Sequence, residues 1–214
     1  MLSTSDIAAI EARIGAIEAH TGAQVVVALV ARSDHFHGLR WRAFALGAAA
    51  AAFVVVLLDL ARPDWVTSHT AIVTAASIIG AGLACTLLAT FVPAFERLFL
   101  PWTRAQAEVR RRATLLFLER ELFATPRRNA VLLLAGRFER AMAVIGDGAY
   151  RDRIDTADWQ RVVDATTPRL AAGDASAAFL AGLDALESVL VAQGFVGVGD
   201  ARNDLPDTPL ESDT

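Results

Sequence analysis

The chain contains 26 consecutive residues without a charge, from Thr70 to Phe95, in a stretch that is rich in Ala, Ile and Leu. About 20 apolar residues are enough for a helix to cross the ~30 Å hydrocarbon core of a bilayer. This stretch therefore predicts a transmembrane helix. It carries no ionisable residue in mid-span, which argues against a transporter or a proton pathway.

A second uncharged run, Ala43 to Leu58, precedes the first but is only 16 residues long. A run of this length is also compatible with a buried core helix, and it can span only if flanking charged residues snorkel outward. The connector between the runs contains a helix-breaking Pro63 and an interfacial Trp65, as expected for a tight turn at a membrane surface. We predict a transmembrane hairpin over 41–96, with spans at about 41–60 and 70–95.

Arginines are distributed unevenly around the two spans. Only Arg62 lies between them, whereas the segments on the outer sides of the hairpin contain Arg32, Arg40, Arg42, Arg97, Arg104, Arg110, Arg111 and Arg112. Positively charged flanks remain on the cytoplasmic side, so we expect an integral protein of the inner (plasma) membrane with both termini cytoplasmic. Arg110, Arg111 and Arg112 are then expected to contact anionic lipid headgroups.

Nucleic acid is not an expected partner. The formal net charge is -4, and no basic run alternates with aromatic residues as a nucleic-acid groove requires. The single cysteine, Cys85, lies inside the second apolar run, so one chain cannot form a disulfide or a thiolate metal site. The expected partners are therefore the lipid bilayer and a membrane or membrane-associated protein of unknown identity.

The segment before the hairpin has the pattern of a helix followed by a strand. Ile7, Ile10, Ile14 and Ile17 recur at spacings of three and four residues, which predicts an amphipathic helix that ends at Thr21-Gly22. The β-branched run Gln24 to Val30 then predicts a strand that is buried on both faces.

The segment after the hairpin continues the alternation. Residues 103–123 have helical spacing, and two short apolar runs around a polar turn predict strands at 130–135 and 141–145. Asp155 has the position of a cap for a helix to Leu170, which Pro168 is expected to kink or divide. A last amphipathic helix begins near Asp174 and ends at Gly194.

This order predicts a three-layer α/β domain with a small mixed sheet, interrupted by a transmembrane helical hairpin. The discontinuous domain would comprise residues 1–34 plus 103–195. In residues 196–214, Asp, Pro and Gly accumulate and five acidic residues face a single Arg202, which predicts a disordered acidic tail.

Two groups of residues could bind a metal. Asp147, Asp152 and Asp155 could position a divalent cation such as calcium or magnesium, with Asp147 and Asp155 as ligands, for hydrolysis of a phosphate ester. The alternative is that Asp147 occupies a turn, Asp155 caps a helix and Asp152 is solvated. The second group, His35 and His37, follows the first strand, but it also suits the membrane interface and no third ligand is apparent.

Five segments follow one another in a recognisable order: Thr21 to Val27, Asn129 to Leu134, Gly146-Asp147-Gly148, Ala172-Gly173-Asp174 and Gly182 to Leu186. This ordered set resembles the TPM-domain family. The resemblance covers residues 5–33 and 113–193 and is closest to a bacterial membrane-protein branch in which two spans follow the first strand. Two departures are Ala130, where the family usually has Gly, and Asp147, where it usually has an aromatic residue.

The resemblance implies a doubly wound α/β fold with acid phosphatase activity in some members and roles in photosystem repair or as receptor accessories in others. One fold can support several functions, so the residues must decide between them. We expect a membrane-anchored, non-catalytic accessory or assembly factor at the cytoplasmic face. The alternative is a metal-dependent phosphatase that acts on phosphomonoesters through Asp147 and Asp155.

Overall fold

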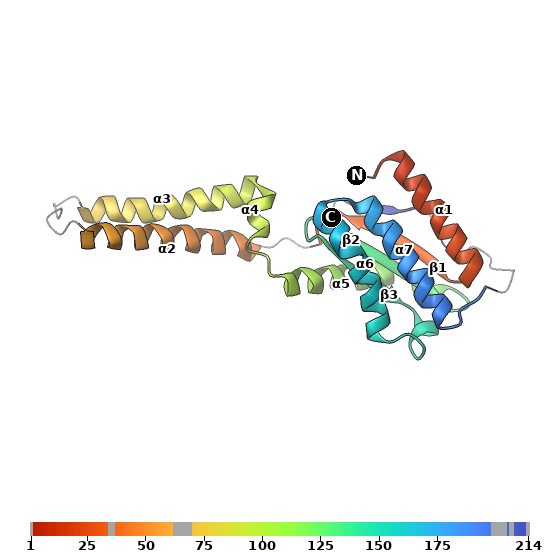
Figure 1. Cartoon of the computed structure of the whole chain (residues 1–214). Helices are drawn as coiled ribbons and strands as arrows, with labels where there is room; N and C mark the ends of the chain where they lie inside the picture. Colours follow the sequence, from red (N-terminus) through yellow and green to blue (C-terminus); the bar gives the residue numbers. More distant parts are fainter. Residues whose placement is uncertain (1, 34–36, 62–69, 198–204, 206–207, 213–214) are drawn as a thin grey trace. The chain divides into compact units, whose positions relative to one another are not determined.

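The computed structural model describes residues 2–33, 37–61, 70–197, 205 and 208–212, and the chain divides into two compact units (Figure 1). One unit joins residues 1–34 to residues 102–214, and the other consists of residues 35–101. The first unit is thus discontinuous in sequence, because the second is inserted shortly after its first strand.

In the described residues, the first unit contains a four-stranded sheet in the order β3-β2-β1-β4. Strand β1 (Gln24–Val30) is parallel to β2 (Ala130–Gly136), and β2 is antiparallel to β3 (Ala141–Gly146). Gln24 lies opposite Ala130 and Val30 opposite Gly136, so β1 and β2 begin and end together. The ends of the two parallel strands therefore lie at the same edge of the sheet.

Every residue of β1 and β2 is buried, because helices cover both faces of the sheet. Val25, Val27 and Leu29 of β1 face one layer, whereas Val26, Ala28 and Val30 face the other. The first layer consists of α1 (Thr4–Thr21), α6 (Thr156–Ala172) and α7 (Ala175–Ala192), and the second is α5 (Trp102–Glu119). The predicted three-layer α/β class with a mixed sheet is confirmed.

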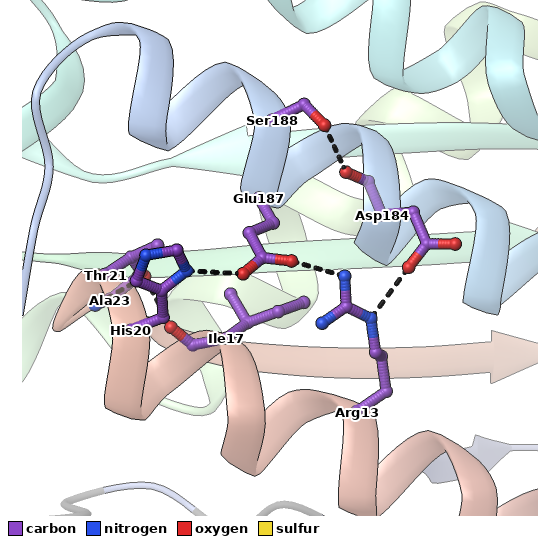
Figure 2. A network of polar contacts seen from close by, with 8 residues as sticks. All are labelled: Arg13, Ile17, His20, Thr21, Ala23, Asp184, Glu187 and Ser188. Atoms are coloured by element: carbon purple, nitrogen blue, oxygen red, sulfur yellow. Dashed lines mark hydrogen bonds and ion pairs between the residues drawn. The ribbon is translucent and has the colours of Figure 1, made fainter.

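Helices α1 and α7 lie side by side and are joined by a polar network (Figure 2). The Arg13 guanidinium donates through Nε to Asp184 Oδ1 at 2.7 Å and through Nη2 to the Glu187 carboxylate. The other oxygen of Glu187 lies 2.6 Å from His20 Nδ1. The network thus links the segment before the hairpin to the last helix after it.

Two helices of the first unit differ from the sequence prediction. The helix expected over 103–123 ends at Glu119, because Glu121 adopts a left-handed conformation with φ 51° before a short 3₁₀ turn, η1 (Leu122–Ala124). Pro168 does not divide α6, which runs without interruption to Ala172 and ends at Gly173 with φ 86°.

The tail expected to be disordered contains a strand. Residues Leu210–Ser212 form β4, which is parallel to β1 and lies opposite Ala28, Leu29 and Val30. Leu210 packs beside the core on the α5 face, so a short apolar contact and a free sheet edge order a segment of acidic composition. The remainder of the acidic stretch lies mostly outside the described residues.

The second unit is a hairpin of α2 (His37–Ala61) and α3 (Thr70–Phe91), followed by α4 (Pro93–Arg97). The second apolar helix ends at Phe91, four residues before the predicted limit, because Pro93 starts a new helix. Glycines allow α2 and α3 to approach closely: a Cβ at Gly47 would lie 2.6 Å from Ala81 O, and one at Gly82 would lie 2.6 Å from the Phe44 ring.

In the described part of the chain, α2, α3 and α7 are long and apolar enough to cross a membrane. Burial separates them: 39% of the apolar window of α7 is buried, compared with 11% for α2 and 6% for α3. Helix α7 packs on the sheet, whereas α2 and α3 leave large apolar side chains such as Phe53, Val56 and Ile72 exposed. Of these three helices, α2 and α3 therefore leave most of their apolar surface uncovered by the described residues.

Candidate functional site

Polar residues gather at the two opposite edges of the sheet. Because β3 is antiparallel to β2, the segment that follows β3 returns to the edge where β1 and β2 begin. Asp147 therefore lies at the amino edge of the parallel pair, whereas Ser33 and the turn 137–140 lie at its carboxyl edge. In open α/β sheets ligands commonly bind at the carboxyl edge.

At the amino edge, Asp147 is held by a bidentate ion pair with Arg128. Arg128 donates through Nε to Oδ2 and through Nη2 to Oδ1, both at 2.8 Å. The backbone N–H of Gly148 donates to the same Oδ1 at 2.6 Å, while the N–H of Asp147 donates to Ala130 O. Hydrogen bonds from Arg128 to Asp147 raise the pKa of the guanidinium. The buried carboxylate is thus fully engaged with the protein's own donors.

Tyr150 and Asn129 complete this edge. The Tyr150 hydroxyl donates to Asn129 O at 2.7 Å, and the Asn129 amide donates to Gly22 O, which ties β2 to the turn before β1. Burial raises the pKa of the Tyr150 phenol, and the nearby Asp147 and Glu18 carboxylates raise it further. The phenol therefore stays protonated and acts as a structural donor.

The other two predicted acids do not join Asp147 around one point. Asp155 caps α6 by accepting the N–H of Asp158 at 2.7 Å, and Asp152 is exposed in the turn before it. In the part of the chain that the structure describes, no three His, Cys, Asp or Glu residues lie close enough to hold a metal ion. The turn and cap roles are thus observed, and metal binding by Asp147 and Asp155 stays a prediction.

Glu139 is the notable group at the carboxyl edge. It lies in the turn between β2 and β3, is 5% exposed, and accepts the Ser33 N–H through Oε1 at 2.7 Å. Among the described residues, its buried Oε2 and the buried Ser33 hydroxyl make no hydrogen bond of good geometry. Burial raises the pKa of this carboxyl, opposed by hydrogen bonds from the Ser33 and Glu139 backbone and by the charge of Arg32.

Gly136 makes room for the Glu139 carboxyl. A Cβ at position 136 would lie 2.5 Å from Glu139 Oε2, 3.0 Å from Val109 Cγ2 and 3.1 Å from Ser33 Oγ. Beside it, the Arg32 guanidinium lies 3.9 Å from the centre of the Phe138 ring. The absence of a side chain at the end of β2 thus allows the turn carboxyl to fold back onto the residue that follows β1.

A hollow of about 420 Å³ adjoins this turn on the α1 and α7 side of the sheet. Leu29 of β1 and Arg137 of the turn line it, and Asp6, Asp174 and Ser176 line it from the starts of α1 and α7. Asp6 and Asp174 are both occupied in capping, since each accepts hydrogen bonds within its own helix start. Arg137 is exposed and contributes a positive charge to the lining of this hollow.

The second predicted metal group cannot be placed. Asp34 and His35 lie outside the described residues, as does the side chain of His37. The three arginines of α5 can be placed: Arg110 and Arg111 are exposed and Arg112 is half-buried.

The sequence prediction missed Glu139, which was assigned only to a polar turn. The sequence did contain a weak signal. Glu139 is an acid in a four-residue turn between two buried strands, and such a turn lies at the edge of the sheet where a parallel neighbouring strand, here β1, also ends. Nothing in the sequence gives the depth of its burial, because that depends on α5 and Gly136.

Comparison with known proteins supports the resemblance seen in the sequence. Residues 99–189 match the family model for the TPM domain, a segment that runs from the end of the hairpin unit through most of α7. The chain is also similar to the NMR structure of BA42 protein from the psychrophilic bacterium Bizionia argentinensis, with 14% identity and a TM-score of 0.60. That alignment covers 99% of this chain and 96% of the other, and it shows a shared fold. No curated protein matches.

Proposed function

We propose that this TPM-domain protein is anchored in the inner membrane by its α2–α3 hairpin and acts there as a non-catalytic accessory or assembly factor. The observation that carries the proposal is the insertion of an apolar hairpin between β1 and α5 of one folded unit. Both halves of the domain are joined covalently to the hairpin, so the sheet cannot move away from a membrane in which the hairpin is embedded.

The polar chemistry of the amino edge favours a non-catalytic role. Asp147, the central residue of the predicted acidic site, is buried and already accepts three hydrogen bonds from Arg128 and Gly148. A carboxylate with these partners gains little from a metal ion unless Arg128 first leaves. The domain is thus better suited to present surfaces to a partner than to activate water at this edge.

Crosslinking in native membranes tests the accessory role. The protein, expressed at its natural level, is expected to give a discrete crosslinked product with one membrane protein. Extraction and mass spectrometry would identify that partner. A pattern of crosslinks that scales only with the abundance of neighbouring proteins would contradict the proposal.

Topology is tested separately. We propose that both termini are cytoplasmic, on the strength of the eight arginines that flank the hairpin compared with one in its connector. Reporters fused after Thr214 and inserted near Asp64 are expected to read cytoplasmic and periplasmic, respectively. A periplasmic reading from the C-terminal fusion would overturn the orientation.

The alternative function, a phosphatase, has one observation in its favour: the family model that matches residues 99–189 is named TPM phosphatase. The test compares hydrolysis of a generic phosphomonoester by the detergent-solubilised protein and by an Asp147→Ala, Asp155→Ala double variant, each with calcium or magnesium. Asp152→Ala is the matched control, because Asp152 is exposed and neither caps a helix nor pairs with Arg128. Activity lost only in the double variant, with its circular dichroism spectrum unchanged, would establish the enzyme.

A further inference from the structure

Strand β3 has an outer side, away from β2, on which no described strand pairs with it. The Asp147 N–H donates to Ala130 O, and hydrogen-bonded pairs alternate with non-hydrogen-bonded pairs along an antiparallel ladder. By this alternation, the backbone N–H and C=O groups of Met142, Val144 and Gly146 point away from β2. The outer side of β3 therefore presents a row of backbone donors and acceptors.

The sequence of β3 does not protect this side. Outermost strands of natural sheets usually carry charged side chains, a proline or a bulge that prevents another strand from pairing. Strand β3 reads Ala-Met-Ala-Val-Ile-Gly, with neither a charge nor a proline, and its pairing with β2 is continuous over residues 141–146. An extended segment can therefore pair with it.

A second hollow, of about 200 Å³, lies along the outer side of β3 and is formed entirely by residues of the first unit. Residues 142–146 of β3 line it, together with Gln106 and Arg110 of α5 and with Trp159 and Val163 of α6. Helix α5 packs on one face of β3 and α6 on the other. A strand added to β3 would therefore lie between these two helices.

We propose that a protein partner binds here by adding an extended segment to β3, and that acidic and apolar side chains alternate along this segment. The inference rests on the proposed accessory role and gives that role a binding surface and a partner segment of stated chemistry. Addition of a strand to the outermost strand of a sheet is a known mode of peptide recognition, in which the backbone provides affinity and the side chains provide specificity.

The lining of the hollow determines the chemistry of the segment. Side chains of an added strand point alternately to the two faces of the sheet. On the α5 face they meet Arg110, which is exposed, and no acidic residue is among those that line the hollow. On the α6 face they meet the half-buried Trp159 and the buried Val163. Acidic side chains toward α5 and apolar side chains toward α6 would match both faces.

A second copy of the chain matches this surface less well. If two β3 strands paired antiparallel about a twofold axis, each copy would contribute the same surface to the contact. The α5 helices of both copies would then lie on the same face of the joined sheet, with Arg110 of each copy at the junction. The residues that line the hollow include no acid to compensate these charges. Charge therefore favours an acidic segment of a different protein.

Peptide selection on the full-length protein in detergent supplies the probe. A displayed library of random nine-residue segments is expected to yield sequences in which acidic and apolar residues alternate. The most enriched peptide is then synthesised, and its dissociation constant is measured by fluorescence anisotropy. Two further syntheses carry N-methyl groups on one or the other alternate set of residues. Methylation of the set whose N–H groups donate to β3 should abolish binding, whereas methylation of the other set should be tolerated.

Charge reversal tests the position of the peptide. Arg110→Glu is expected to weaken binding of the selected peptide about fivefold, and a peptide with lysine in place of its acids should regain affinity for this variant. Arg111→Glu is the matched control, because Arg111 is exposed on the same helix but does not line the hollow. Circular dichroism verifies that both variants are folded.

Four results would overturn the inference. If both methylated peptides bind equally well, the peptide does not pair as a strand. If Arg110→Glu and Arg111→Glu have equal effects, the peptide does not lie in the hollow. If the protein dimerises and the dimer excludes the peptide, a second copy pairs with β3. If no peptide is selected although the crosslinked product forms in native membranes, the inference fails and the accessory role stands, whereas absence of both contradicts the accessory role as well.

Discussion

The buried carboxylates at the two edges of the sheet differ in their hydrogen-bond partners. At the amino edge, Asp147 is paired with Arg128 and accepts a backbone N–H, so its charge is fully compensated. At the carboxyl edge, Glu139 is equally buried, but only one of its oxygens has a hydrogen bond of good geometry, and burial raises its pKa. A buried acid with complete partners holds the fold together, whereas one with an unused oxygen retains capacity for another contact.

The difference also shows where a ligand could bind. The amino edge is closed by Tyr150, Asn129 and the Arg128 pair, whereas the carboxyl edge adjoins a hollow of about 420 Å³ beside Arg137. The hairpin unit is inserted shortly after Ser33, so the chain leaves the first unit at this edge. If the domain binds a ligand at its sheet, we expect the carboxyl edge to be the site.

The largest effect is expected from Asp147→Ala. The substitution removes three hydrogen bonds, two of them to a guanidinium, from a buried position, and we expect a loss of about 2–3 kcal/mol in the free energy of unfolding. Urea titration in mild detergent, followed by tryptophan fluorescence, measures it. Asp152→Ala serves as the exposed control, and an equal loss in both variants would show that the amino edge is not held by the Asp147 pair.

Gly136→Ala is expected to cause the next largest loss in the free energy of unfolding. Its Cβ would lie 2.5 Å from the Glu139 carboxyl and 3.0 Å from Val109. Forcing a methyl group into such a site costs about 1–3 kcal/mol. The cost should shrink when Glu139→Ala is combined with Gly136→Ala, because the carboxyl no longer competes for the space. Strict additivity of the two single effects would mean that Gly136 does not make room for Glu139.

Local sequence signals predicted the elements that local chemistry determines. The continuous apolar runs gave β1, β2 and β3, while Asp155 and Gly22 marked helix ends through caps that the structure contains. The charge-free runs gave α2 and α3, because membrane-length helices need only composition and length.

The features that the sequence did not predict depend on contacts between segments that are distant in the chain. The Arg128–Asp147 pair requires the antiparallel return of β3, which brings residues 19 positions apart together. The burial of Glu139 requires the parallel register of β1 and β2, across the whole hairpin insertion. Strand β4 was missed because its acidic composition indicates disorder, whereas the free edge of β1 that orders it is a property of the folded sheet.

Glu139→Gln tests whether the unused oxygen of Glu139 affects stability. The expected effect is smaller than those of Asp147→Ala and Gly136→Ala. A carboxyl whose pKa is raised above its ordinary 4.5 by folding contributes stability that is complete below 4.5 and lost as the pH rises through the folded pKa. Glutamine stays neutral, still accepts the Ser33 N–H and offers an amide to the Ser33 hydroxyl. At pH 7 we expect it to stabilise the protein by about 1 kcal/mol and to flatten this part of the pH dependence. A destabilised variant at pH 7 would show that the ionised carboxylate is needed.

Glu187→Gln, in the α1–α7 network, should have the smallest effect and the opposite pH dependence (Figure 2). Hydrogen bonds from His20 and then Arg13 lower the pKa of Glu187, so its contribution is present above the ordinary 4.5 and is lost as the pH falls through the folded pKa. The network lies at the protein surface, where water and salt screen such pairs, and we expect a loss below about 1 kcal/mol at pH 7. Urea titrations between pH 3 and 7 should therefore show both variants converging with the parent protein at low pH. At pH 7 Glu187→Gln is expected to be less stable than the parent, whereas Glu139→Gln is expected to be more stable. If both variants change the stability at pH 7 in the same direction, the contrast between a carboxylate with hydrogen bonds to both oxygens and one with an unused oxygen does not hold.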